Sequence, residues 1–131
     1  MSEIVTGNAH REARHYRGWF IGHFLSPAGD PRATADVEVK WGVHKAGEVK
    51  YTWAKSTAAT TLSLLVRGRF RLSFPNHEFL LAEEGDYVIW SPQVFHKWQA
   101  EQDSVVLTVR WPSVPGDVVV AEGGPERGES G

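Results

Sequence analysis

Residues 85–96 read Gly-Asp-Tyr-Val-Ile-Trp-Ser-Pro-Gln-Val-Phe-His, and this stretch decides the fold. Its apolar segment, Tyr87–Trp90, is β-branched and aromatic, which is typical of a strand. Gly85-Asp86 before it and Ser91-Pro92 after it have the chemistry of tight turns. The stretch therefore predicts a turn, a short strand and a second turn, after which His96 enters the next strand.

Further short strands are predicted on both sides of this stretch. Apolar and polar residues alternate with period two in residues 37–43 and again in 105–111. Other segments rich in β-branched, leucine and aromatic residues are Thr60–Val66, Arg69–Phe74 and Phe79–Ala82. Glycine, proline and asparagine separate them, and no segment carries three turns of helical periodicity. The pattern predicts an all-β sandwich or barrel.

The length of 131 residues allows one domain. Residues 1–17 are polar and mixed in charge, and we expect an extended or frayed N-terminal arm. Gly, Glu and Pro dominate the end of the chain, so residues 116–131 are expected to form a flexible tail. The barrel domain is therefore expected to span residues 18–115.

Composition argues against several classes of function. The net charge of −2 offers no basic field for a nucleic-acid backbone, so no nucleic-acid partner is expected. The chain has no cysteine, which removes disulfides, cysteine–zinc sites and thiol nucleophiles. No apolar stretch approaches the roughly 18 residues of a membrane helix, and no secretory signal is visible, so we expect a soluble cytoplasmic protein without a membrane partner.

The stretch 85–96 resembles the second conserved motif of the cupin family. Residues 45–48 followed by 65–72, with Gly68 at the family's glycine, resemble the frame of the first motif. The resemblance covers about residues 36–112. It implies a small double-stranded β-helix, or jelly-roll barrel, into which His96 projects.

The resemblance also draws attention to missing metal ligands. In cupins the first motif supplies an H-x-H pair and a glutamate that bind a divalent ion together with the second-motif histidine. Trp53, Lys55 and Thr61 stand at those three places here, and none of them is a usual ligand. We therefore expect no metal and no other cofactor.

A displaced metal site is the alternative to this expectation. His44, Glu48 and His96 would form it if they met across adjacent strands. Lys40 opposes such a site, because an ammonium in the same pocket repels a cation.

The candidate site residues follow from the strand faces. His96 is the predicted proton donor or acceptor, poised near neutral pH, and His44 is a second catalytic candidate. Lys40 shares the face of His44, because residues two and four apart in a strand point the same way. That face lines the barrel or, as an ordinary outer face, meets solvent. Arg110 is an anchor for a carboxylate or phosphate if it points inward, and a solvated charge if it points outward.

Aromatic residues complete the expected pocket. Trp98 lies two residues after His96 and shares its face, and Trp53 stands at a place that opens onto the pocket in cupins. A pocket with aromatic walls and a few polar anchors suits a small organic molecule.

The leading functional hypothesis is a small-molecule-binding, metal-independent protein, an isomerase, epimerase or cyclase that works by acid–base catalysis. The alternatives are a non-enzymatic metabolite-binding or sensor module, and a metal-dependent oxygenase or isomerase that uses the displaced ligands. The resemblance also implies a homodimer, because cupins often pair through their sheets. The apolar residues 18–25 favour the same partner by adding to a neighbour's strand edge, unless they fold back on their own barrel.

Overall fold

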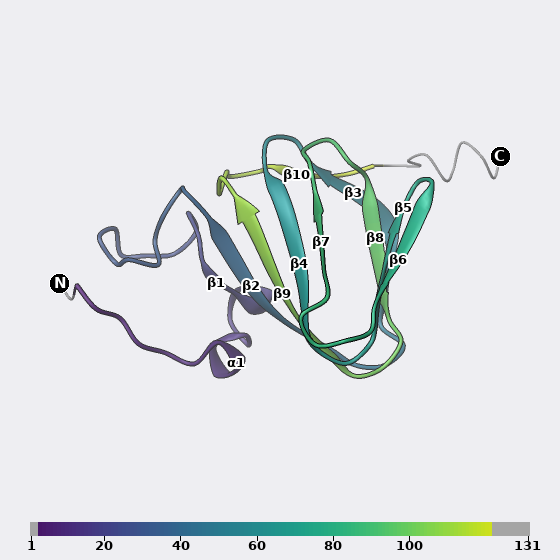
Figure 1. The fold of residues 1–131 in the computed structure, drawn as a ribbon. Coiled ribbons are helices and arrows are strands. Elements are labelled where there is room, and N and C mark those ends of the chain that lie inside the picture. Colours follow the sequence, from purple (N-terminus) through teal and green to yellow (C-terminus); the bar gives the residue numbers. More distant parts are fainter. Residues whose placement is uncertain (1–2, 122–131) are drawn as a thin grey trace.

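The computed structural model describes residues 3–121 and shows two antiparallel sheets of five strands each. Sheet A has the order β1-β2-β9-β4-β7, and sheet B has the order β10-β3-β8-β5-β6. The sheets face each other, join at a rounded end and spread apart toward a wide end (Figure 1). The strands are β1 (Trp19–Ile21), β2 (Glu38–His44), β3 (Val49–Ser56), β4 (Thr60–Arg67), β5 (Phe70–Phe74), β6 (His77–Leu81), β7 (Tyr87–Trp90), β8 (His96–Ala100), β9 (Ser104–Trp111) and β10 (Val118–Val120).

The all-β prediction is confirmed, and the strand predicted from residues 85–96 is β7 with the expected bounds. The predicted strand at residues 18–25 is shorter, because Gly22 ends it. The Gly22 amide bonds to the Arg32 carbonyl, and the Gly22 carbonyl accepts from Leu25 and Thr34. β1 pairs with β2 of its own chain, so this segment folds back on its own barrel.

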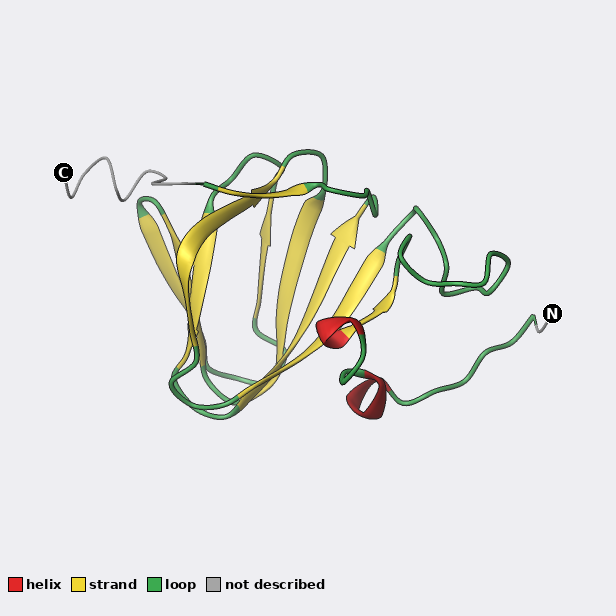
Figure 2. Cartoon of the chain, turned by 180° about the vertical axis from the view of Figure 1, so that it is seen from behind, coloured by secondary structure: helices red, strands yellow, loops and turns green. Residues whose placement is uncertain are grey.

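The N-terminal arm contains two short helices, α1 (Ala9–Glu12) and η1 (Tyr16–Gly18), where an extended segment was expected. Asn8 caps α1, since its Oδ1 accepts from the Arg11 amide at 3.0 Å and its own amide donates to Glu12 at 2.8 Å. The Trp41 indole donates to His10 Nδ1 at 3.1 Å. These contacts hold the arm against β2, outside sheet A (Figure 2).

The C-terminal boundary also differs from the expectation of a flexible tail from residue 116. β10 pairs with β3 in sheet B. The Asp117 carboxylate accepts from the Thr57 hydroxyl at 2.6 Å and from the Ala58 and Ala59 amides at 2.7 and 3.1 Å. Three bonds to one carboxylate hold this segment in place, and composition alone did not reveal them. The rest of the predicted tail, residues 122–131, lies outside the described residues.

Sheet A has an unusual polarity, because its polar residues face the barrel interior and most of its apolar residues, apart from Leu65, Trp90 and Val106, face outward. The strand register places the inward side chains of β9 and β4 level with one another, Arg110 beside Thr61 and Thr108 beside Ser63. Leu107 and Val109 alternate with them and point outward. The hydrophobic alternation therefore marks the outer face of this sheet.

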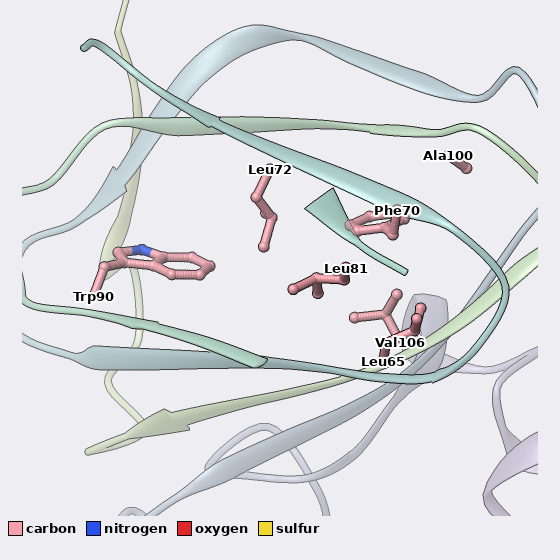
Figure 3. Packing of buried hydrophobic residues seen from close by; sticks show 7 residues of the cluster. All are labelled: Leu65, Phe70, Leu72, Leu81, Trp90, Ala100 and Val106. Atoms are coloured by element: carbon pink, nitrogen blue, oxygen red, sulfur yellow. The ribbon is translucent and has the colours of Figure 1, made fainter. Parts of the chain in front are cut away.

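The core occupies the rounded end of the barrel (Figure 3). Sheet A contributes Leu65, Trp90 and Val106, and the other four residues of the cluster come from sheet B. Trp90 stands apart from the leucine, valine and phenylalanine side chains, toward the wide end. The buried residues of this cluster are Leu65, Phe70, Leu72, Leu81, Trp90, Ala100 and Val106.

Gly68, the glycine of the first-motif frame, has φ +107°, which favours glycine. A Cβ at this position would clash with the Ser104 hydroxyl and the Asp103 carbonyl. The turn before β5 therefore needs a residue without a side chain. Separately, none of the helices within residues 3–121 has the length and apolar character needed to span a membrane.

Candidate functional site

A cavity of about 70 Å³ lies between the two sheets. Strands from both sheets contribute polar side chains to it, and the aromatic residues come from β5, β7 and β8. Its lining consists of Lys40, His44, Lys50, Thr61, Ser63, Phe70, Leu72, Trp90, His96, Trp98, Val106, Thr108 and Arg110.

The structure brings together Lys40, His44, His96, Trp98 and Arg110 at this cavity. The solvated-face alternative for Lys40, His44 and Arg110 is therefore wrong.

Trp53 is the exception among the residues predicted to line the pocket. The register between β3 and β8 shifts between Lys50 and Ala54, so Ala54 is the residue opposite His96. Trp53 is buried away from the cavity lining, with Lys97 Nζ 4.7 Å from its ring centroid. The prediction that Trp53 forms part of the pocket wall is therefore wrong.

Lys50 is the cavity residue that sequence reasoning missed. It pairs with Trp98 across β3 and β8 and reaches the cavity from sheet B. The sequence reasoning identified no strand over Val49–Ser56, so no inward face was assigned to Lys50. Burial, with Arg110 and Arg17 nearby, lowers the pKa of Lys50.

Lys40 reaches the cavity from sheet A. Burial, followed by the charges of Arg110 and Lys50, lowers its pKa to about 8. Desolvation disfavours an ammonium, and neighbouring cations add to the effect. Because that pKa lies close to neutral pH, Lys40 is able to donate or accept a proton under ordinary conditions.

Arg110 is held in a fixed orientation by a chain of polar contacts. Its Nη1 donates to Glu38 at 3.1 Å, and the second oxygen of Glu38 accepts from the Ser113 hydroxyl at 2.7 Å. The Ser113 oxygen lies 2.6 Å from His23 Nδ1. The Ser113 hydroxyl has one proton, which it donates to Glu38. His23 Nδ1 therefore carries the proton of its own contact with the Ser113 oxygen. Trp19 packs on the guanidinium with its ring centroid 4.7 Å away.

His44 is buried with a defined tautomer. Its Nδ1 lies 3.2 Å from Glu48, whose other oxygen accepts from the Lys45 amide at 2.8 Å. A carboxylate only accepts, so Nδ1 carries the proton. Nε2 leans over Gly42 on the inner face, where a Cβ would stand 2.8 Å away. Burial lowers the pKa of His44, which favours the neutral ring and leaves a lone pair on Nε2.

His96 is 6% exposed and lies beside Trp90, with 4.8 Å between the ring centroids. Burial, then the charges of Lys50 and Arg110, lowers its pKa to about 4. The sequence reasoning placed this histidine near neutral pH. The imidazole is instead neutral in the free protein, because burying a further cation beside Lys50 and Arg110 is costly.

Within residues 3–121, four buried polar atoms of the cavity lining have no hydrogen-bond partner. They come from four different strands, β4, β7, β8 and β9. Buried polar groups in folded proteins normally have a partner, so an unpartnered cluster indicates a place for water or ligand. The atoms are Thr61 Oγ1, Trp90 Nε1, His96 Nδ1 and Arg110 Nε.

The donor chemistry of the cavity does not fit a divalent metal. Two ammonium groups and a guanidinium line it, and these repel a cation. The displaced ligand set His44, Glu48 and His96 is wrong as a cluster, since no group of three histidine, aspartate or glutamate residues within the described part of the chain can hold a metal. Glu48 has 44% of its side chain exposed and bonds to His44 Nδ1.

Comparisons with known proteins identify the fold. No family model matches the sequence, and no curated protein matches it. A double-stranded β-helix protein from Klebsiella pneumoniae matches with a TM-score of 0.64 and 15% identity, covering 93% of this chain and 99% of that chain. KdgF from Halomonas sp. matches with a TM-score of 0.56 and 22% identity, covering 62% of this chain and 74% of that chain.

The DMSP lyase DddQ from Ruegeria pomeroyi matches with a TM-score of 0.61 and 16% identity, covering 72% of this chain and 48% of that chain. A cupin-2 domain protein from Shewanella frigidimarina is also similar, with a TM-score of 0.51. The chain therefore has the cupin double-stranded β-helix fold, as the resemblance in residues 85–96 implied.

Proposed function

We propose that the protein binds a small organic molecule in the barrel cavity and converts it by acid–base catalysis without a metal, as an isomerase, epimerase or cyclase. The four unpartnered buried polar atoms of the cavity carry this proposal. Such atoms are costly to bury unless a bound molecule satisfies them.

The proposed roles follow from the two walls of the cavity. On sheet A, His44 Nε2 accepts a proton, and Lys40, with its pKa of about 8, exchanges one near neutral pH. On sheet B, the neutral imidazole of His96 is the second proton-transfer group. Groups on opposite walls suit a reaction that removes a proton at one position and returns it at another. Arg110 orients the ligand, and Trp98 forms part of the wall.

The test uses proton exchange in D₂O, because an acid–base catalyst of this kind labilises protons next to a carbonyl group. Pyruvate and hydroxyacetone, one anionic and one neutral, are incubated with the protein and followed by ¹H NMR. We expect exchange of the methyl or methylene protons of at least one probe, unaffected by EDTA. The His96→Gln and His44→Gln variants should each slow it at least tenfold, a loss within the usual contribution of a general acid or base.

His77→Gln is the matched control, because it removes an exposed histidine at the start of β6. Exchange at the parent rate in His96→Gln would rule out the proton-transfer role of that residue. Saturable binding of a probe without exchange would instead establish a binding or sensor module.

We further propose that the outer face of sheet A pairs with a second copy of the chain. Its outward side chains on β7, β4 and β9 are apolar, and Tyr87, Ile89 and Trp111 are 61%, 52% and 39% exposed. Contiguous exposed apolar surface of this kind favours an interface. In an isologous dimer the same face of the two copies meets, so each copy covers the exposed apolar surface of the other.

Sedimentation equilibrium tests this pairing. We expect the parent protein to be dimeric and Ile89→Lys to be monomeric, because a charge at the centre of an apolar interface is not solvated. Gln102→Lys, in an exposed loop, is the control and should remain dimeric. A monomeric parent protein would contradict the proposal.

A further inference from the structure

The cavity is strongly cationic for a chain of net charge −2. Lys40, Lys50 and Arg110 line it, and Arg17 adds its charge to both lysines from η1. Glu38 forms an ion pair with Arg110 at 3.1 Å, and the charges of Glu48 and Asp117 act on Lys40 and Arg110, respectively, without contacting them. Cations buried close together repel one another, so a compensating negative charge would stabilise this arrangement.

The unpartnered atoms fall in one row across sheet A. Thr61 pairs with Arg110 on β9 and with Trp90 on β7, so these three residues are level with one another. Their inward side chains come from neighbouring strands, where paired residues stand about 5 Å apart. His96 extends the row from sheet B, with its ring against Trp90. The row lies toward the wide end, where Trp90 stands apart from the core (Figure 3).

Arg110 shows which kind of group this row is built to meet. The Arg110 Nη1 donates a hydrogen bond to Glu38. The Arg110 Nε is buried and has no hydrogen-bond partner among the described residues. A guanidinium binds a carboxylate through parallel N–H bonds, and its side edge contains Nε. The Trp90 indole is also purely a donor, and the Thr61 hydroxyl is able to donate. Donors and cations together indicate an acceptor group of negative charge.

The volume of the cavity restricts the size of the ligand. One water needs roughly 10–15 Å³ of such volume, so about 70 Å³ holds on the order of five water-sized groups. Typical ligand pockets are several times larger. The volume of the cavity therefore favours a short-chain acid over a sugar acid or an aromatic acid.

We propose that the ligand of this cavity is a short-chain carboxylate, with the carboxylate on Arg110 Nε and the Thr61–Trp90 row, and with Lys40 and Lys50 compensating its charge. The inference rests on the proposed function, because it names the ligand class of the same cavity. It adds the requirement that the ligand carry a negative charge, which small-molecule binding alone does not impose.

Acetate and acetamide form the decisive pair of probes, since they match in shape and differ in charge. Each is titrated at pH 7.0 and constant chloride, while NMR follows the His96 ring and Trp90 indole signals. We expect saturable shifts with acetate and at least tenfold weaker binding of acetamide, the range of one lost charged hydrogen bond. Bound acetate should also raise the pKa of His96, because it compensates Lys50 and Arg110.

Two variants test the assigned contacts while keeping the charges of the cavity. Arg110→Lys keeps a cation beside Glu38 but has no Nε–H fork, and Thr61→Val keeps the shape of the side chain without its hydroxyl. Each should weaken acetate binding severalfold or more. Arg67→Lys, at the exposed end of β4, is the control and should bind acetate as the parent does.

The outcomes separate this inference from the proposed function. Equal binding of acetamide and acetate, or binding of hydroxyacetone without acetate, overturns the carboxylate assignment and leaves small-molecule binding intact. Unchanged acetate affinity in both Arg110→Lys and Thr61→Val overturns the assigned contacts. If acetate, acetamide, pyruvate and hydroxyacetone all fail to perturb the His96 and Trp90 signals, the proposed function fails as well.

Discussion

His96 makes the stability of this barrel depend on pH in a way that can be calculated. Its pKa is lowered from 6.5 to about 4 in the folded chain by burial and by the nearby Lys50 and Arg110. The unfolded chain therefore binds this proton more readily than the folded chain between pH 6.5 and 4. Stability is lost as the pH falls through that window, and the loss from His96 reaches about 3 kcal/mol at pH 4.

The perturbation is His96→Gln, which removes the titrating group but keeps a polar side chain of similar size. The free energy of unfolding is measured by urea denaturation at pH 7, 6, 5 and 4 for both proteins. Carboxylates with lowered pKa values, such as Asp86 and Asp117, make both proteins less stable in acid. The difference between the two curves isolates His96, and it should change by about 3 kcal/mol in favour of the variant as the pH falls from 7 to 4.

His77→Gln serves as the control. Its free energy of unfolding must depend on pH as steeply as that of the parent, because the variant keeps His96. Parallel curves for the parent and His96→Gln would refute the reasoning. They would mean that the ring is charged inside the barrel, or that water reaches it freely.

Three further substitutions test the physical account of the fold. Lys40→Met should raise stability by about 1–3 kcal/mol at pH 7, and the gain should shrink as the pH rises from 8 to 10.5, since the parent then loses the buried charge. Asp117→Asn should cost about 1–3 kcal/mol in urea unfolding, with the exposed Asp36→Asn neutral. Gly68→Ala should cost well over the roughly 1 kcal/mol expected for Gly47→Ala, because both have positive φ but Gly47 has open space around it; equal thermal shifts would contradict the clash.

The sequence predicted most of the strands, though not β3 or β10, because period-two alternation and turn residues are local signals. Residues 85–96 formed the expected turn and strand, and His96 and Trp98 share one face as strand geometry requires. The alternation of residues in β9 predicted two faces, but it did not show which face points into the barrel. Apolar residues usually point inward, so Arg110 could be read as a solvated charge, whereas the barrel places Arg110 inside and Leu107 and Val109 outside.

Features that depend on pairing between distant strands were beyond the sequence. Across β3 and β8, Lys50 pairs with Trp98 and reaches the cavity, whereas Ala54 rather than Trp53 is opposite His96. The lowered pKa of His96 arises from Lys50 and Arg110, which lie 46 and 14 residues away in the chain, together with burial. Asp117 anchored a segment whose composition indicated a tail, because its hydrogen-bond partners lie near residue 58.

The separation of the apolar cluster at the rounded end from the polar row toward the wide end has a consequence for motion. At the polar end the row of polar side chains interrupts the apolar packing, although Phe74 and Trp90 still pack against each other there. At the other end, Leu65, Phe70 and Leu72 are almost completely buried. Regions of low apolar burial open through local fluctuations far below the free energy of global unfolding. We therefore expect the polar end to open locally more often than the apolar end, so that a ligand enters there while the apolar end stays folded.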